Sequence, residues 1–578
     1  MKEWHKKWKA PALVVGIWFC ILLTAFTVKD DLFEISKNLA IFSALYQHIN
    51  DHYVEKVDAT TLMEHGIQGM LGQLDPYTEF IPEVSVEDFR VKYIQTQYGG
   101  IGAQVLVNKD EHIIIAEIFE GFAAHRYGLC VGDEIVRVDG VVVEGKSVEE
   151  VSHLLKGRPG TIVRLAVKRY GNTEKEFAIA RDKVIQPNVS YSQMLANGIG
   201  YVKLDKFLSG ASEEVHQAIA NLRKRGELNG LILDLRDNGG GILQEAVRIV
   251  NLFVNQGEEV VTQQGKVHGD DFTYITMQKA FMPQLPLAIL INGRSASASE
   301  IVAGALQDMD RAVVLGNKSF GKGLVQQTYH LPYNNMVKIT IAKYYTPSGR
   351  CIQALDYKHK DKTGRPLPVE DSLMSAFTTK NGREVYSGNG IFPDVVLQKG
   401  ETSAVIRALM KQLLIMDYAS HYYEQHGHIT SPRNFHISDG EYNRFLNYLS
   451  ARHFSFQHET DDRLAQLKLA AVDEGLITEL NTDLQTIQRK IQYSKQQAVT
   501  LHRDEIKLQL EKEIVARYYY KKGVYELLES RDSGIVQAHR ILEPSNAHFY
   551  QAILSGQDTF QVIGKPLLHD TPLQMVTE

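Results

Sequence analysis

Cysteine is scarce in this sequence, which has only three in 578 residues, Cys20, Cys130 and Cys351. Cys20 lies in an apolar stretch, so no disulfide framework is implied, although a single bridge between Cys130 and Cys351 stays open. The sequence contains no C-x-x-C pair and no H-E-x-x-H motif, which removes the common zinc signatures. We therefore expect neither a disulfide-rich scaffold nor a metal site.

An excess of charge of one sign is also missing. The chain has 63 Lys and Arg against 69 Asp and Glu, a net charge of -6, which gives no electrostatic reason to expect a nucleic-acid partner. Apolar residues (44%) and charged residues (23%) have the proportions of soluble globular proteins, and there is no internal repeat or low-complexity linker. Because one hydrophobic core cannot serve a chain of this length, we expect several domains.

One uncharged run stands out near the start of the chain. Residues 10–28 carry no charge and as a helix would extend about 28 Å, enough to cross a bilayer core. Four lysines precede the run and two aspartates follow it, so the positive-inside rule places residues 1–9 in the cytoplasm and the rest outside. A cleaved signal peptide is the competing interpretation. No A-x-A site precedes a plausible cut, which favours a retained anchor.

The remaining sequence divides into four segments by its hydrophobic pattern. Residues 32–95 show helical spacing, and residues 96–182 contain short β-branched runs separated by glycine turns. Residues 190–400 alternate strands with helices, which indicates an α/β domain. Residues 401–578 are mainly helical. The predicted fold class is multidomain α+β, with a membrane helix, a helical region, a β-rich module, an α/β core and a helical extension.

A serine-rich segment in the α/β domain has the character of a catalytic turn. Asn-Gly-Arg-Ser-Ala-Ser-Ala-Ser-Glu, residues 292–300, follows an apolar strand (Leu287–Ile291) and leads into an apolar-periodic helix. Free backbone N–H groups at a helix N-terminus favour negative charge, so an oxyanion formed at Ser297 would be stabilised there. Taken alone, these serines are more often simple helix caps.

Two further features add weight to a catalytic interpretation. The run Gly239–Gly241 ends an apolar strand and allows the backbone to approach a ligand. Lys322 stands between two glycines, and a buried, neutral lysine can serve as the base that a serine nucleophile needs. A nucleophile, a base and oxyanion donors are the components of acyl transfer, provided that they meet in space.

The motifs around these residues resemble those of the carboxy-terminal processing, or tail-specific, protease family. Ser-Ala-Ser-Ala-Ser-Glu and Phe-Gly-Lys-Gly-Leu-Val-Gln carry the likeness, which covers about residues 32–398. The resemblance implies a crotonase/Clp-like protease core and a bacterial enzyme, without cofactor, acting outside the cytoplasmic membrane. It assigns Ser297 as nucleophile and Lys322 as general base. The other roles it implies are lysine orientation by Gln326 and a weaker supporting role for Asp308. It also implies oxyanion binding by the N–H groups of Ala298 and of a glycine in the run Gly239–Gly241, with Gly240 preferred.

The β-rich module resembles a PDZ domain, through Tyr-Gly-Gly-Ile-Gly-Ala at residues 98–103 and Gly-Leu-Cys-Val-Gly-Asp-Glu-Ile at residues 128–135. PDZ domains add a peptide end as a strand and hold its carboxylate on loop N–H groups, here Gly100, Ile101 and Gly102. The implied partners are polypeptide substrates bound by their C-terminal tails. A homo-oligomer or an adaptor protein is also compatible with the sequence, which identifies neither the substrates nor the role of the helical extension.

Three alternatives belong to other classes. A catalytically silent PDZ scaffold or chaperone would bind exposed chain ends without needing Ser297 and Lys322, both of which are present. A crotonase-like enzyme acting on acyl thioesters would require neither Ser297 nor a PDZ module. A histidine-dependent periplasmic protease normally places the protease before its PDZ domains, whereas here the module comes first. A serine protease accounts for more of the sequence than any of these.

Overall fold

The computed structural model describes residues 32–93, 96–108, 110–169, 173–266, 269, 271–362, 364–397, 403–456 and 459–556. The chain forms two compact units, of which unit 1 contains residues up to Glu83 together with Gln326–Thr340, and unit 2 contains Val84–Val325 and Ile341–Glu578. The predicted membrane anchor at residues 10–28 lies outside the described residues. No helix within the described ranges combines the length and the apolar character needed to cross a bilayer.

Unit 1 contains the helices predicted near the start of the chain. Residues 32–52 are helical, and α2 (Ala59–Leu71) is capped by Asp58, whose Oδ1 accepts the Thr61 N–H at 2.8 Å. Strand β1 (Glu79–Ile81) pairs antiparallel with β18 (Met336–Tyr345), and β17 (Leu324–His330) also pairs with β18. The chain passes between the two units within β17 and β18.

The β-rich module of unit 2 is an antiparallel sheet with its own core. Its strand order is β3-β4-β5-β7-β8, with β6 paired to β5 and with β2 and β9 forming a separate pair. Helix α5 begins after Ser147, whose hydroxyl accepts the Glu150 N–H in a capping box. The elements are α3 (Val86–Tyr93), β2 (Gln97–Gly100), β3 (Ala103–Val107), β4 (Ile113–Ile118), α4 (Ala123–Arg126), β5 (Glu134–Val138), β6 (Val141–Val142), α5 (Val148–Leu155), β7 (Ile162–Arg169), β8 (Thr173–Ala180) and β9 (Asp182–Ile185).

The α/β core is built on a six-stranded sheet in the order β10-β11-β12-β15-β16-β23. Its central strands are parallel and buried on both faces, which explains why they are continuous apolar runs in the sequence. The strand expected at Leu287–Ile291 has the predicted bounds. The strands are β10 (Val189–Met194), β11 (Ile199–Leu204), β12 (Gly230–Asp234), β15 (Leu287–Ile291), β16 (Val313–Gly316) and β23 (Val395–Val396).

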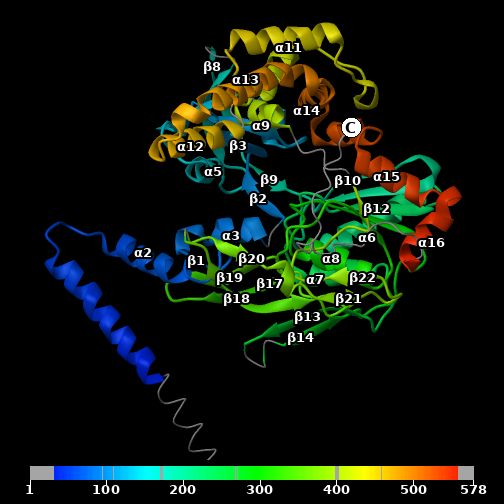
Figure 1. The fold of residues 1–578 in the computed structure, drawn as a ribbon, viewed down its shortest axis with the longest axis horizontal. Coiled ribbons are helices and arrows are strands. Elements are labelled where there is room, and N and C mark those ends of the chain that lie inside the picture. Colours follow the sequence, from blue (N-terminus) through cyan, green and yellow to red (C-terminus); the bar gives the residue numbers. More distant parts are fainter. Residues whose placement is uncertain are drawn as a thin grey trace, which may run out of the picture. The chain divides into compact units, whose positions relative to one another are not determined.

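Helices from distant parts of the sequence cover the two faces of this sheet (Figure 1). One face packs against α6 (Ala211–Arg225), α7 (Leu243–Asn251) and α8 (Ala298–Asp308). The other face packs against α15 (Ser533–Leu542) and α16 (Ala547–Ser555), which belong to the range predicted as a helical extension. The end of the chain therefore completes the core of the α/β domain.

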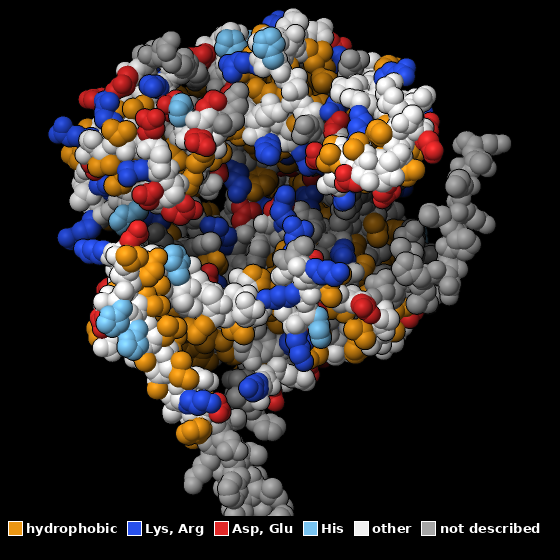
Figure 2. Space-filling model, turned by 60° about the vertical axis from the view of Figure 1, so that its left-hand side comes forward, with side chains coloured by type: hydrophobic (Ala, Val, Ile, Leu, Met, Phe, Trp, Pro, Cys, Tyr) orange, Lys and Arg blue, Asp and Glu red, His pale blue; other side chains and the backbone are white. Residues whose placement is uncertain are grey.

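The rest of unit 2 contains two small two-stranded sheets, β19-β20 and β21-β22, and a helical region with its own core, while β13 pairs with β14 and with residues 342–345 of β18. The remaining strands are β13 (Glu259–Gly265), β14 (Phe272–Ile275), β19 (Leu355–Lys360), β20 (Pro366–Pro368), β21 (Ala376–Thr378) and β22 (Glu384–Tyr386). The remaining helices are α9 (Ala404–Lys411), α10 (Leu414–Gln425), α11 (Asp439–Ala451), α12 (Glu459–Asp473), α13 (Ile477–Leu501) and α14 (Arg503–Leu528). Cys130 and Cys351 are both free thiols. Acidic and basic side chains are intermingled on the face drawn in Figure 2.

Candidate active site

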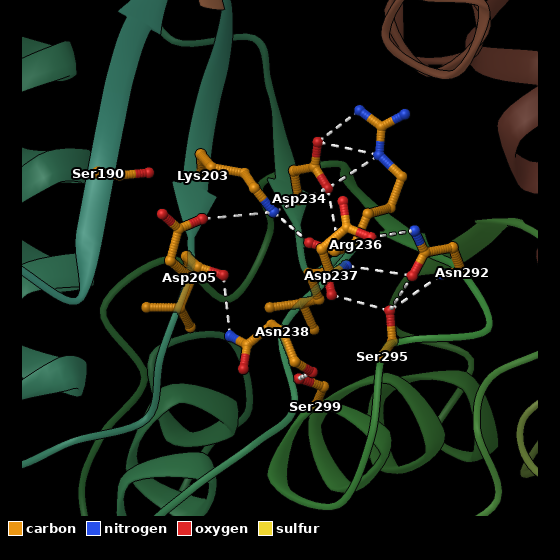
Figure 3. Close-up of polar contacts among 12 residues, drawn as sticks. Ser190, Lys203, Asp205, Asp234, Arg236, Asp237, Asn238, Asn292, Ser295 and Ser299 are labelled. Carbon is orange, nitrogen blue, oxygen red and sulfur yellow. Dashed lines mark hydrogen bonds and ion pairs between the residues drawn. The ribbon is translucent and has the colours of Figure 1, made fainter. Parts of the chain in front are cut away.

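The turn between β15 and α8 contains three serines, one of which differs from the other two in burial. Ser295 and Ser299 are fully buried, and their hydroxyls donate to the carbonyls of Leu235 and Asn238 at 2.8 and 2.9 Å (Figure 3). Ser297 is only half-buried and stands at the N-cap of α8. Ser295 and Ser299 therefore hold the turn in place, and Ser297 is the serine that can meet a substrate.

The backbone of Ser297 has the strain that is typical of a nucleophile turn. Its φ is 56° and its ψ is -115°, values that a residue with a side chain rarely adopts. Strained backbone of this kind persists only where the surrounding structure enforces it, and in hydrolases a sharp strand-to-helix turn presents a serine hydroxyl in this way. A helix cap does not require this backbone conformation, so capping alone does not account for residue 297.

The loop after β12 lies directly against Ser297. Asn238 is fully buried, and its side chain donates to the Leu204 carbonyl at 2.8 Å and accepts the Gly240 N–H at 2.9 Å. Its carbonyl accepts the N–H of Ala296 at 3.0 Å, which joins the loop to the serine turn. Gly240 has φ 91°, and a Cβ there would lie 2.8 Å from the Ser297 Cβ, so only glycine fits.

The predicted oxyanion donors are placed beside the serine, with one difference from expectation. Within the described residues, nothing accepts the N–H groups of Ala298 and Gly239, whereas the Gly240 N–H is engaged by the Asn238 side chain. Ala298 stands on the first turn of α8, where N–H groups have no partner within the helix. Gly239 and Gly241 are therefore the glycines of the run whose N–H groups have no acceptor among the described residues. Gly241 lies against Phe207, since a Cβ there would be 2.4 Å from the Phe207 carbonyl oxygen.

Glu300 connects the serine turn to the lysine loop, a role that sequence reasoning missed. It is fully buried, and its Oε2 accepts the N–H groups of both Ser297 (2.8 Å) and Lys322 (2.9 Å). Its Oε1 accepts the Ser319 hydroxyl at 2.5 Å and the Gly321 N–H at 2.6 Å. Burial raises the pKa of Glu300 above its usual range, against the opposing effect of these hydrogen bonds.

One carboxylate oxygen thus holds the backbones of Ser297 and Lys322 on either side of itself. The sequence contained a signal for this arrangement, because Ser-x-x-Glu before an apolar helix predicts a glutamate that reaches back to the N-cap N–H. Only the structure reveals that the same carboxylate also binds the lysine loop.

The other predicted site residues lie at different places. Gln326 belongs to unit 1, where its side-chain amide donates to the Thr340 hydroxyl at 3.2 Å, so its predicted effect on Lys322 stays a prediction. Asp308 is at the far end of α8, about 16 Å from Ser297 at the rise of an α-helix. There it forms a buried 2.7 Å ion pair with Arg350, which indicates a structural role.

The predicted peptide-binding loop lies at the end of β2. The side chain of Ile101 is buried in the core of the module, and the carbonyls of Ile101 and Gly102 accept N–H groups from the segment that contains α4. Gly102 has φ 78°, and a Cβ there would lie 2.4 Å from the Phe122 Cβ. Among the described residues, nothing accepts the N–H groups of Ile101 and Gly102, so both are available to a ligand.

Within the described ranges, no three His, Cys, Asp or Glu side chains come together as metal ligands would.

Four family models match successive parts of the chain. They are "Activating protease CtpB N-terminal domain" over residues 25–83, "PDZ domain" over residues 91–168, "Peptidase family S41" over residues 198–358 and "Probable PDZ-protease, C-terminal helical domain" over residues 405–542. The matches to the PDZ and S41 models cover the two modules described above as separate sheets.

Known proteins resemble the chain over most of their own length. A carboxy-terminal-processing protease of Bartonella bacilliformis is 34% identical over 336 residues, which cover 57% of this chain and 76% of the relative. A CtpA-like serine protease of Staphylococcus haemolyticus is 33% identical over 371 residues, covering 62% and 72%. Among solved structures, the photosystem II D1 C-terminal processing protease is 25% identical, with a TM-score of 0.34 over 64% of this chain and 96% of the other.

Proposed function

Because the chain belongs to peptidase family S41, the carboxy-terminal-processing serine proteases, we propose that it is an endopeptidase that uses a Ser297 and Lys322 pair. The observation that carries this proposal is the shared carboxylate, since Glu300 binds the backbones of both residues through one oxygen. The S41 model covers both residues as well. The substrates are polypeptides of the bacterial cell envelope.

The proposed reaction proceeds through an acyl-enzyme. Lys322 in its neutral form removes the proton from the Ser297 hydroxyl, and the serine oxygen attacks the carbonyl carbon of the scissile bond. The N–H groups of Ala298 and Gly239 bind the resulting oxyanion. The C–N bond then breaks, the lysine returns its proton to the leaving amine, and a water molecule activated by Lys322 hydrolyses the ester.

The PDZ module is proposed to select substrates by their C-terminal carboxylate. The available N–H groups of Ile101 and Gly102 support this role, because a carboxylate requires several donors from one loop. A scaffold that binds chain ends without cutting them would use the same loop, but it would not need the strained serine beside two available N–H groups.

A matched pair of substrates tests both parts of the proposal. We expect the full chain to cut a denatured protein with an apolar C-terminus, and the same protein ending in an amide to have a KM about 10-fold higher, because charge-assisted hydrogen bonds are lost. A fluorophosphonate is expected to stop both reactions and to label Ser297 in mass spectrometry, while EDTA has no effect. Binding of the carboxylate substrate without any cleavage would favour the scaffold.

The proposed location is the outer side of a bacterial cytoplasmic membrane, with a single anchor at residues 10–28. The support is the uncharged run and the lysines before it. We expect the full chain to remain in the membrane fraction after alkaline carbonate extraction, and a chain lacking residues 1–31 to become soluble and keep its activity. Recovery of a soluble mature form cut near residue 28 would instead indicate a cleaved signal peptide.

A further inference from the structure

The ion pair between Arg236 and Asp532 joins the C-terminal helices to the loop beside the nucleophile. Asp532 is the N-cap of α15, and its Oδ1 accepts the Ile535 N–H at 3.0 Å. Both carboxylate oxygens of Asp532 also accept from Nη1 of Arg236, at 2.8 and 2.9 Å. The two residues are 296 positions apart in the sequence.

Arg236 is fixed on its other side by the α/β core itself. Its Nε and Nη2 donate to Asp234, the last residue of β12, at distances of 2.6 to 3.1 Å. Its carbonyl accepts a hydrogen bond from Lys203, and Figure 3 shows Lys203, Asp234 and Arg236 together. The guanidinium therefore lies between an acid of the core and an acid of the C-terminal helices, with little freedom to move.

The residues that follow Arg236 form the loop against Ser297. Asp237 has φ 63° and accepts from the side chains of Asn292 and Arg294, at 2.8 and 2.6 Å, on the serine side of the loop. Gly239 and Gly240 come two and three residues later. The start of the loop is thus held by Asn292 and Arg294 through Asp237, and by Asp234 and Asp532 through Arg236.

We propose that Asp532 is a positioning residue for the oxyanion loop and acts on catalysis through Arg236. This inference rests on the proposed function. Asp532 holds the guanidinium in the direction that sets the start of the loop, and the loop then presents the Gly239 N–H to the carbonyl oxygen of the substrate. The C-terminal helices contribute in this way to the reaction as well as to the fold.

Docking of α15 does not depend on this ion pair. The helix packs on the sheet through Ile535, Ala538, Ile541 and Leu542, all of which are buried with residues of the central strands. A pair that retains some contact with solvent contributes little to stability. The geometry of the pair matters more than its energy. Both carboxylate oxygens of Asp532 bind Nη1 of Arg236, which restrains the orientation of the guanidinium.

The test compares Asp532→Asn with Glu529→Gln in the full chain. Asparagine caps a helix as well as aspartate does, so Asp532→Asn removes the negative charge that faces the Arg236 guanidinium and leaves the cap of α15. Glu529 is the matched control, because it also joins the helical region to the core, through the Tyr191 hydroxyl at 2.6 Å, and it makes no contact with the loop. Both side chains are similarly shielded, with exposed fractions of 20% and 13%.

We expect Asp532→Asn to lower kcat about 10- to 50-fold with KM within about twofold, because a small misplacement of an oxyanion donor acts on the transition state. The affinity for a peptidyl boronate, which forms a tetrahedral adduct with the serine, is expected to fall by the same factor. Glu529→Gln should leave both quantities within about twofold of the parent. Asp532→Glu, which keeps the charge, is expected to recover part of kcat.

Two results would overturn the inference. One is equal kcat values for Asp532→Asn and Glu529→Gln. The other is a fall in kcat in Asp532→Asn that is accompanied by a higher KM and a lower melting temperature, which would indicate a structural role. Failure of the proposed function is a separate outcome, since the parent chain would then cut nothing. The comparison is meaningful once the parent cleaves and Ser297→Ala does not.

Discussion

Alanine at Ser297 or at Lys322 is expected to lower kcat for peptide cleavage by about 10⁴-fold or more, because each removes a member of a unit that acts together. The Ser297→Ala change keeps the Cβ and the backbone N–H that donates to Glu300, so it should leave the turn and its strain as they are. Steady-state cleavage of a denatured substrate measures the loss, and circular dichroism with thermal melting checks the fold.

Matched controls exist for both changes. Lys318 is an exposed lysine four residues before Lys322, and its own side chain donates to Asn389. Lys318→Ala should keep activity within about twofold of the parent. Ser299→Ala removes a buried hydrogen bond to the Asn238 carbonyl and should lower stability by about 1 kcal/mol. Its loss of kcat should be far smaller than that of Ser297→Ala, because the Ser297 hydroxyl is kept and Ser295 still holds the turn. Full activity of either Ser297→Ala or Lys322→Ala would exclude the proposed pair.

The strands of the α/β core could be predicted because they are buried on both faces. In β12 and β15 every residue is buried, so the two strands are apolar in the sequence except for the buried Asp234 at the end of β12. The order of the strands and the faces covered by helices could not be predicted in this way. Periodicity indicates that Ile535, Ala538 and Ile541 share one face of a helix, but it does not say which surface they cover.

The choice among the three serines shows a similar limit. Composition and spacing make Ser295, Ser297 and Ser299 equivalent candidates for a cap or a nucleophile, and the family resemblance selected Ser297. The physical difference is that Ser295 and Ser299 are committed to the carbonyls of residues 235 and 238. Because these partners lie about 60 residues earlier in the sequence, local sequence patterns cannot predict these hydrogen bonds.

Long-range polar contacts are the part of the site that only the structure supplies. Arg236 and Asp532 are ordinary charged residues in the sequence, and their pairing depends on the way α15 packs on the sheet. The family resemblance implied an oxyanion donor in the run Gly239–Gly241, with Gly240 preferred, whereas the Gly240 N–H is engaged by Asn238. A hydrogen bond two residues along the loop decides which glycine is available.

Glutamine at residue 300 is expected to lower both stability and kcat, because a neutral amide cannot replace the carboxylate of Glu300. The carboxylate accepts four hydrogen bonds, whereas an amide has one oxygen and would turn an NH₂ group toward two of the donors. Leaving buried donors unpaired costs about 2–4 kcal/mol in the free energy of unfolding. Loosening the backbones of Ser297 and Lys322 together should lower kcat by about 10² to 10³-fold.

The control for this change is Glu245→Gln. Glu245 is also buried in a helix and accepts hydrogen bonds from the Ser212 N–H and hydroxyl, at 2.8 and 2.6 Å, in a part of the core that does not contact Ser297 or Lys322. Its loss should lower stability and leave kcat within about twofold. If both variants lose kcat equally, the role given to Glu300 at the site is wrong.

The dependence of stability on pH supplies a second measurement, since burial raises the pKa of Glu300 above its ordinary value. The folded chain then holds this proton more tightly than the unfolded chain, so the contribution of Glu300 to stability is complete below about pH 4.5 and is lost as pH rises through the folded-state pKa.

The glutamine side chain of Glu300→Gln does not titrate. The difference in the free energy of unfolding between parent and Glu300→Gln should therefore narrow as pH rises across this window, and denaturant melts in a series of buffers would measure it. A difference that widens with pH would mean that the four hydrogen bonds outweigh burial and that the carboxylate is charged throughout.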